Sequence, residues 1–198
     1  MRKLLTPLVA FGLLSAYVMA DTSSVRKAPE LAFTLPGQGD KLLSQYRGKV
    51  VAIEFILTTC PHCQQASRFM TKYQQEYGPH GFQAIDLAIN ALDEGRKPDQ
   101  ASLLAETFAN NFQVGFPVGF IGRDPMMSFM GFSVMDRMVV PQLVLIDRKG
   151  IIRYQTPAGD SEEYGKMMNE TTIQQHIEEL LAQPATAAGH RAPAKKAL

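Results

Sequence analysis

The sequence lacks the features that mark several classes of protein. Its formal net charge is only +1, so it has no basic surplus with which to bind a nucleic-acid backbone, and no nucleic-acid partner is expected. We find no internal repeat. Hydrophobic residues make up 45 % of the chain and charged residues 20 %, a balance that predicts a folded globular domain rather than a disordered chain. With 198 residues, the chain is long enough for one domain with a substantial core.

Cysteine is scarce as well. The two cysteines, Cys60 and Cys63, stand at C-x-x-C spacing, so a single disulfide is available. Closing a loop with two intervening residues restrains the unfolded chain very little, which makes this disulfide a poor structural brace. The pair therefore indicates redox chemistry rather than a structural role.

The first twenty residues have the pattern of a secretory signal peptide. Arg2 and Lys3 form a short positive region, residues 4–18 are apolar and uncharged, and Val18-Met19-Ala20 offers small or apolar residues at the cleavage positions. The alternative is an uncleaved N-terminal membrane anchor, since the apolar run is about as long as the shortest spanning helices. Both interpretations place the folded domain outside the cytoplasm, in the periplasm or an equivalent compartment, where disulfides persist.

Behind this segment the sequence divides into three parts. Residues 21–27 are expected to form a leader, residues 28–182 a folded domain, and residues 183–198 a disordered tail rich in Ala, Pro and Lys. Apolar patterns predict strands over 30–35, 50–57, 82–89, 116–120, 142–146 and 151–154, and helices after Cys60, after Asp99 and after Thr171. One further short helix is expected within residues 122–138. This order predicts an α/β fold with a mixed central sheet flanked by helices.

The cysteines lie where the predicted strand 50–57 turns into a helix. Pro61 suits the first helical turn, where its missing N–H costs nothing. The unpaired N–H groups of that turn and the helix dipole favour a thiolate at Cys60, and a protonated His62 would add a positive charge nearby. Cys60 is therefore the predicted nucleophile that forms a mixed disulfide with a substrate. Cys63, one helical turn later, is predicted to face inward and to resolve that mixed disulfide.

Glu54 is the only charged residue in the apolar run 50–57, and it precedes Cys60 by six positions. A lone buried carboxylate is costly unless its pKa is raised or it has a function. Glu54 is therefore a candidate to accept the proton of Cys63. The alternative interpretation is that Glu54 points to a solvated end of the strand.

Pro141 stands just before the predicted strand 142–146, where a proline is typical of an edge, a first position or a special turn. A cis peptide between Val140 and Pro141 would expose the backbone of Val140 beside the sulfurs, where it could pair with an incoming extended peptide. An ordinary trans proline at the start of the strand is the alternative, and spacing alone does not decide between the two.

Four segments together resemble the extracytoplasmic TlpA/ResA-like branch of the thioredoxin superfamily. They are Ala28-Pro29-Glu30-Leu31, Arg47-Gly48-Lys49-Val50-Val51, the strand that leads into Cys60-Pro61-His62-Cys63, and the run from Val140-Pro141 to Lys149-Gly150. The resemblance covers residues 28–182. It implies a thioredoxin-like fold, a cis proline at Pro141 and a buried carboxylate at Glu54. It also implies a protein thiol–disulfide oxidoreductase, a reductase such as one in cytochrome c maturation, with a membrane or exported redox partner.

The chain departs from the family pattern at three places. Thr59 replaces the aromatic residue that is usual before the first cysteine, residue 140 is valine, and Pro61-His62 resembles the dipeptide of DsbA-type oxidants. The dipeptide favours an oxidant, whereas the overall pattern favours a reductase. The sequence therefore leaves the direction of electron flow open while indicating the same thiol chemistry.

Two other functions stay open at this point. A thiol peroxidase of the peroxiredoxin type shares this fold, although the proline expected ahead of a lone peroxidatic cysteine is missing here. A copper(I)-binding module is the other alternative, because thioether and thiolate ligands suit Cu(I) and methionines cluster at positions 126, 127, 130, 135 and 138. Methionine also fills irregular cores and lines adaptable peptide grooves. We expect that role here, with protein thiols and disulfides as partners and with no cofactor and no metal.

Overall fold

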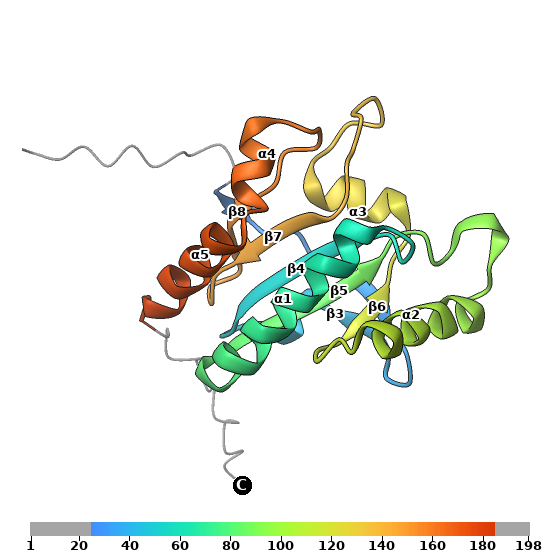
Figure 1. Cartoon of the computed structure of the whole chain (residues 1–198), viewed down its shortest axis with the longest axis horizontal. Helices are drawn as coiled ribbons and strands as arrows, with labels where there is room; N and C mark the ends of the chain where they lie inside the picture. The colour runs from blue at the N-terminus through green and yellow to red at the C-terminus, as the bar shows by residue number, and fades with distance from the viewer. Residues whose placement is uncertain (1–24, 185–198) are drawn as a thin grey trace, which may run out of the picture.

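Eight strands form one mixed sheet in the computed structural model, which describes residues 25–184 (Figure 1). The strands are β1 (Arg26–Lys27), β2 (Ala32–Leu35), β3 (Gly39–Leu42), β4 (Val50–Ile56), β5 (Phe82–Ala88), β6 (Val118–Phe120), β7 (Gln142–Ile146) and β8 (Ile151–Gln155). Their order across the sheet is β1-β8-β7-β4-β5-β6-β2-β3. β4 runs parallel to β5, and β5 to β6, while the other neighbours are antiparallel. The mixed α/β sheet that the sequence predicts is confirmed.

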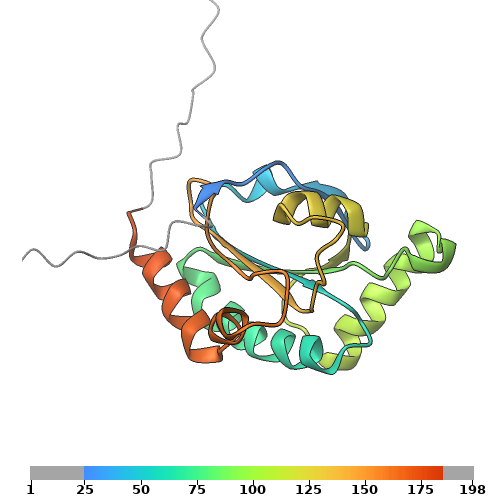
Figure 2. The same cartoon turned by 90° about the horizontal axis from the view of Figure 1, so that it is seen from above.

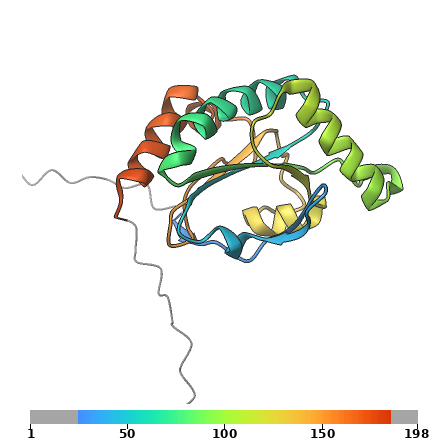
Figure 3. The same ribbon diagram turned by 90° about the horizontal axis from the view of Figure 1, so that it is seen from below.

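Helices cover both faces of this sheet. They are α1 (Pro61–Tyr77), α2 (Pro98–Phe112), α3 (Arg123–Met130), α4 (Glu162–Met167) and α5 (Glu170–Ala182), with 3₁₀ turns at Leu43–Tyr46, Gly78–His80 and Asp93–Gly95. α1, α2 and α5 lie on one face, and α3 lies on the other (Figure 2, Figure 3). Each face buries its own apolar cluster, with Phe129 of α3 in one and Met70 of α1 and Ile177 of α5 in the other. The sheet is therefore the middle layer of a sandwich.

β4 is buried along its whole length, as the apolar run predicts for a central strand. Ile53 and Phe55 pack on the α3 side of the sheet, whereas Val50 and Ala52 pack on the α1 side. Side chains along a strand alternate between the two faces. Glu54 therefore belongs to the α1 side, beneath the helix that carries Cys63.

Some details differ from the elements that the sequence predicts. Arg26–Lys27 pairs with β8, so the folded part begins inside the leader expected for residues 21–27. α5 begins at Glu170, ahead of the start after Thr171 that the sequence predicts, and the side chain of Asn169 caps it by accepting hydrogen bonds from backbone N–H groups. α4 and β3 have no counterpart among the predicted elements, because neither has the apolar period of a buried helix or strand. The short helix expected within 122–138 is α3.

Three of the predicted segments cannot be compared in full. The signal segment expected for residues 1–20, the first residues of the leader and the tail beyond residue 184 lie outside the described residues. Within residues 25–184, no helix is both long and apolar enough to cross a bilayer.

Candidate active site

Cys60 occupies the N-cap position of α1, at the turn that follows β4. Its backbone is extended, with φ −86° and ψ 121°, and its N–H donates a hydrogen bond of 3.0 Å to the carbonyl oxygen of Leu57. Pro61 is the first residue of the helix, as predicted. A proline lacks a backbone N–H, and at this position the helix has no partner for that group in any case. The half-buried Cys60 is thus located at the positive end of the helix dipole.

The turn between β4 and α1 is held by Asn90, which sequence analysis did not single out. The side-chain oxygen of Asn90 accepts a hydrogen bond of 3.2 Å from the N–H of Thr58, and its amide donates one of 3.1 Å to the Thr58 hydroxyl. Asn90 follows β5, the parallel neighbour of β4. The ends of the two strands are therefore tied together beside Cys60. A polar residue directly after a buried strand was the available signal.

Cys63 lies one turn into α1 and is fully buried, as predicted. Both cysteines are free thiols. Burial raises the pKa of Cys63 well above its usual range, and the neighbouring Cys60 and Glu54 raise it further. Because desolvation disfavours a thiolate, this thiol needs a nearby group to take its proton before it can react.

Glu54 is fully buried, which excludes the alternative that it points to a solvated end of the strand. Burial is the main cause that raises the pKa of Glu54 well above its ordinary value, and the carboxyl of Asp86 raises it further. Glu54 also raises the pKa of Cys63, so the carboxyl and the thiol are within electrostatic reach of each other. The structure therefore brings together the two groups between which the sequence predicts proton transfer.

Asp86 is a second buried carboxyl at the site, and sequence analysis missed it. It lies opposite Glu54 in the register of the parallel strands β4 and β5, and it is fully buried. Its Oδ2 accepts a hydrogen bond of 2.6 Å from the hydroxyl of Ser67, a buried residue of α1. The signal was present, because Asp86 is the only charged residue in the predicted strand 82–89, as Glu54 is in its own strand.

The peptide bond between Val140 and Pro141 is cis, as the family resemblance implies. The carbonyl oxygen of Val140 lies 4.0 Å from the Sγ of Cys60. The backbone just before β7 is therefore beside the predicted nucleophile, although 80 residues separate the two in sequence.

The buried side chain of Gln142 holds the segment before β7 in place, and sequence analysis did not single it out. It is fully buried, and the two protons of its amide nitrogen are shared among three carbonyl oxygens within hydrogen-bond distance, those of Val139, Pro157 and Ala158. Its side-chain oxygen accepts from the hydroxyl of Thr156. One side chain thus ties the segment before Pro141 to the segment after β8, with its polar atoms satisfied despite burial.

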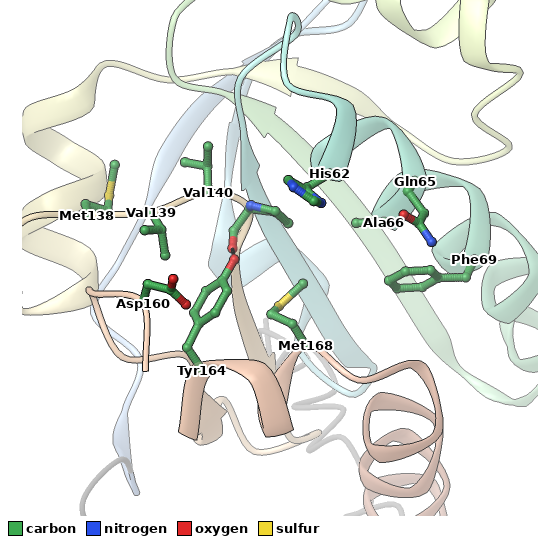
Figure 4. A pocket seen from close by; sticks show the side chains of 11 residues that line it. His62, Gln65, Ala66, Phe69, Met138, Val139, Val140, Asp160, Tyr164 and Met168 are labelled. Carbon is green, nitrogen blue, oxygen red and sulfur yellow. Dashed lines mark hydrogen bonds between the residues drawn. The ribbon is translucent and has the colours of Figure 1, made fainter. Parts of the chain in front are cut away.

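A cavity of about 590 Å³ lies between α1, the segment before β7 and α4 (Figure 4). His62 and Phe69 of α1 line one side, residues 138–141 line another, and Tyr164 of α4 closes a third. Much of the remaining lining is apolar, and the carboxylate of Asp160 lies at the cavity. Because His62 and residues 138–141 are also next to Cys60, the cavity begins beside the nucleophile.

The methionines proposed as copper ligands do not converge on one point. Met126 and Met130 are buried residues of α3, whereas Met135 is 86 % exposed and Met138 lines the cavity. Among residues 25–184, no three His, Cys, Asp or Glu side chains are grouped as metal ligands. The structure thus places Met126 and Met130 in the core and Met138 at the cavity, and leaves Met135 exposed.

Known proteins provide an independent comparison. The family model described as Redoxin matches residues 24–172. The chain is similar to the thiol-disulfide oxidoreductase ResA of Geobacillus kaustophilus (strain HTA426), with 26 % identity over 153 residues that cover 77 % of this chain and 75 % of the relative. ResA of Geobacillus thermodenitrificans (strain NG80-2) is 25 % identical over 138 residues, which cover 70 % of this chain and 67 % of the relative.

Solved structures share the fold. A putative thiol:disulfide interchange protein DsbE from Chlorobium tepidum superposes with a TM-score of 0.60 at 25 % identity, covering 80 % of this chain and 97 % of that one. The hypothetical protein SMc02350 from Sinorhizobium meliloti 1021 superposes with a TM-score of 0.62 at 15 % identity, covering 83 % and 88 %. At 15 % identity, the likeness to the Sinorhizobium meliloti protein shows a shared fold alone. The thioredoxin-like fold predicted from the sequence is confirmed by this agreement.

Proposed function

This chain belongs to the Redoxin family, and we propose that it exchanges disulfides with exported protein thiols through its Cys60-Pro61-His62-Cys63 centre. It is a TlpA/ResA-like thiol–disulfide oxidoreductase of the thioredoxin superfamily, in line with the ResA relatives and the DsbE-like fold. One observation carries the finer proposal. The half-buried thiol of Cys60 lies at the N-terminus of α1, one turn before the fully buried thiol of Cys63, and the carboxyl of Glu54 is within electrostatic reach of Cys63.

The reaction follows from the positions of the two sulfurs. The thiolate of Cys60 attacks a substrate disulfide, so that a Cys60–substrate disulfide forms and the first substrate sulfur leaves as a thiolate. Cys63 then loses its proton to Glu54 and attacks the Sγ of Cys60. The Cys60–Cys63 disulfide forms, the Cys60–substrate bond breaks, and the second substrate sulfur leaves and takes up a proton. Two electrons have passed from the enzyme to the substrate.

The surroundings of Cys60 support a protein substrate. The backbone of Val140, beside the Sγ of Cys60, can pair with an extended peptide. The mostly apolar cavity next to it, about 590 Å³ in volume, is large enough to take side chains that flank the substrate cysteine. Asp160 and His62 at its edge would distinguish charged neighbours of that cysteine.

Export and redox direction are part of the same proposal. The signal-peptide pattern of residues 1–20 supports an extracytoplasmic site of action. The segment would be either a cleaved signal peptide or an uncleaved N-terminal membrane anchor. The overall pattern of the sequence motifs favours a reductase, such as one in cytochrome c maturation, whose disulfide is reduced again by a membrane or exported partner. A reduction potential near that of thioredoxin, about −270 mV, is expected, and one near that of DsbA, about −120 mV, would assign an oxidant instead.

Two single variants test the roles of the cysteines. Cys63→Ser, reduced and mixed with a peptide disulfide, should accumulate a Cys60–peptide disulfide that mass spectrometry detects, because the resolving thiol is gone. Cys60→Ser should trap nothing and should lose exchange activity. The wild-type protein is the control and should release both peptide thiols. Equal trapping by the two variants would contradict the assignment of roles.

A further inference from the structure

We propose that Asp86 is a positioning residue that forms one proton-sharing carboxyl pair with Glu54 and thereby keeps Glu54 able to take the proton of Cys63. The inference rests on the thiol–disulfide exchange proposed above. It assigns a role to Asp86, a buried group that takes no part in the exchange steps of Cys60, Cys63 and Glu54.

The geometry of the pair comes from the sheet. Glu54 and Asp86 are register partners on the parallel strands β4 and β5, both on the face covered by α1, and both are fully buried. Among the described residues, neither oxygen of Glu54 nor the Oδ1 of Asp86 accepts a hydrogen bond from a donor. Buried polar atoms without partners are rare in proteins and often belong to functional sites.

Charge repulsion then keeps at least one proton on the pair near neutral pH. Two ionised carboxylates side by side in a buried place repel each other, and one of them keeps its proton. The salt bridges of residues 25–184 hold other carboxylates, with Lys72, Arg96, Arg153 and Lys166 as the cations. Burial raises the pKa values of both Glu54 and Asp86, in agreement with a retained proton.

Ser67 decides which carboxyl carries the negative charge. Its hydroxyl has a single proton and two acceptors in reach, the Asp86 Oδ2 at 2.6 Å and the carbonyl oxygen of Cys63 at 3.0 Å. The shorter bond to a charged acceptor is the stronger one. It stabilises the carboxylate at Asp86, so that the shared proton lies on the Glu54 side.

The pair can then pass on a proton without creating a second buried charge. As the proton of Cys63 moves to Glu54, the proton already on Glu54 moves to Asp86. The single negative charge passes from the pair to the sulfur of Cys63, which attacks Cys60, and the leaving substrate thiolate takes a proton back. A protonated Glu54 without Asp86 would have no carboxylate beside it to take over its proton, and so could not accept the proton of Cys63.

Other titratable groups face the same space. They are the thiols of Cys60 and Cys63 on α1 and the hydroxyl of Tyr164 on α4. Burial raises the pKa of Tyr164 as well as that of Cys63, so both stay neutral through the acidic and neutral range. Over that range, the carboxyl pair is the group on this face whose protonation controls the resolution of the mixed disulfide.

The test is the pH profile of that resolution step. Reduced wild-type protein and Asp86→Asn are mixed with an excess of peptide disulfide, quenched with acid at intervals, and analysed by mass spectrometry for the Cys60 mixed disulfide and its decay. The chain contains no tryptophan, so this readout replaces intrinsic fluorescence. Asp99→Asn, at an exposed position of α2, is the matched control and should behave as the wild-type protein.

In Asp86→Asn, the rise of the rate with pH should move to higher pH, because a coupled pair gives up its first proton at a lower pH than a single buried carboxyl does. The loss should be about tenfold on the acidic side and should close to about twofold or less at alkaline pH. The first step, attack by Cys60, should keep its rate. Ser67→Ala should shift the profile in the same direction by a smaller amount, since it removes the hydrogen bond that stabilises the Asp86 carboxylate.

Failure of this proposal differs from failure of the proposed function. If the wild-type protein forms no mixed disulfide or does not resolve it, disulfide exchange itself is wrong. If the wild-type protein does both, and a folded Asp86→Asn has a superimposable pH profile, only the role of Asp86 is overturned. A uniform loss of both steps at every pH, with a lowered melting temperature, would show that Asp86 is structural and would also overturn the role.

Discussion

The hydroxyl of Tyr164 donates a hydrogen bond of 2.7 Å to the carbonyl oxygen of Pro141. Tyr164 lies on α4, a helix of six residues with no buried residue, capped by the side chain of Ser161. Pro141 belongs to the segment beside Cys60. This bond therefore ties a short helix with little core of its own to the active-site segment and closes one side of the cavity.

Tyr164→Phe should weaken the binding of peptide substrates while leaving the chemistry intact. A hydrogen bond of this kind contributes about 1 kcal/mol, so KM for a peptide disulfide should rise about fivefold. The rate with a small disulfide such as hydroxyethyl disulfide, which does not fill the cavity, should not change. Steady-state kinetics with both substrates measure this, with Tyr46→Phe, remote from the cavity, as the control. An equal loss with both substrates would mean that Tyr164 supports the thiols themselves.

The contrast between these elements explains what sequence analysis could find. β4, α1 and the β7–β8 hairpin were predicted because buried strands and helices need apolar side chains at a regular period. α4 has no such period, and the Tyr164–Pro141 hydrogen bond joins it to the segment beside the cavity. Glu54 stood out as the only charge in an apolar run. Asp86 is likewise the only charge in its predicted strand. Its role, however, depends on its lying opposite Glu54, and the pairing of β4 with β5 cannot be read from either strand's sequence alone.

Glu54→Gln should slow the resolution of the mixed disulfide by about tenfold or more, which corresponds to about 1.4 kcal/mol of barrier. The reason is that a neutral amide cannot accept the proton of Cys63, whose pKa is raised by burial. Attack by Cys60 should be nearly unaffected. The acid-quench assay separates these steps, and Glu76→Gln, at an exposed position of α1, is the control. Resolution at the wild-type rate would make Glu54 a structural residue only.

The buried carboxyls also predict how stability depends on pH. The pKa values of Glu54 and Asp86 are raised in the folded state above the ordinary values of 4.5 and 3.8, so the folded protein holds protons that the unfolded chain releases. Their contribution to stability is fully present below those ordinary values and is lost as the pH rises toward the folded-state pKa values. The slope is at most about 1.4 kcal/mol per pH unit for each proton.

Urea unfolding of the reduced protein between about pH 5 and 7 measures this effect, since each retained proton contributes to the slope in that window. The free energy of unfolding should fall with rising pH more steeply for the wild-type protein than for Glu54→Gln. Comparing the two removes the opposite contribution of Glu30, whose pKa is lowered in the folded state. Parallel curves would mean that the buried pair is already ionised in this range.

Export predicts a defined N-terminus. If residues 1–20 are a cleaved signal, the protein produced with its full sequence in a bacterium should be found outside the cytoplasm and begin near Asp21. Intact-mass spectrometry of the cell fractions measures this. Met1 retained in the membrane fraction would indicate the anchor instead, and Met1 retained on cytoplasmic protein would contradict export in either form.

Arg148 predicts a stability effect far from the thiols. It lies in the turn between β7 and β8, and its guanidinium donates hydrogen bonds of 2.8 Å to the carbonyl oxygens of Leu181 and Gln183, at the end of α5. It also donates to the carbonyl oxygens of Leu180 and His80. A cation at a helix C-terminus is favoured by the dipole and satisfies carbonyls that have no partner within the helix.

Arg148→Ala should therefore lower the free energy of unfolding by about 2 kcal/mol, because it leaves several of these carbonyl oxygens without a donor. In a protein of this size, the melting temperature should fall by about 4–8 °C. Arg148→Lys keeps the charge but loses the planar fork that reaches several acceptors, so it should cost about half as much. Lys149→Ala, the neighbouring cation, is the matched control and should change little. If Arg148→Ala and Lys149→Ala melt together at the wild-type temperature, these hydrogen bonds do not hold α5 in place.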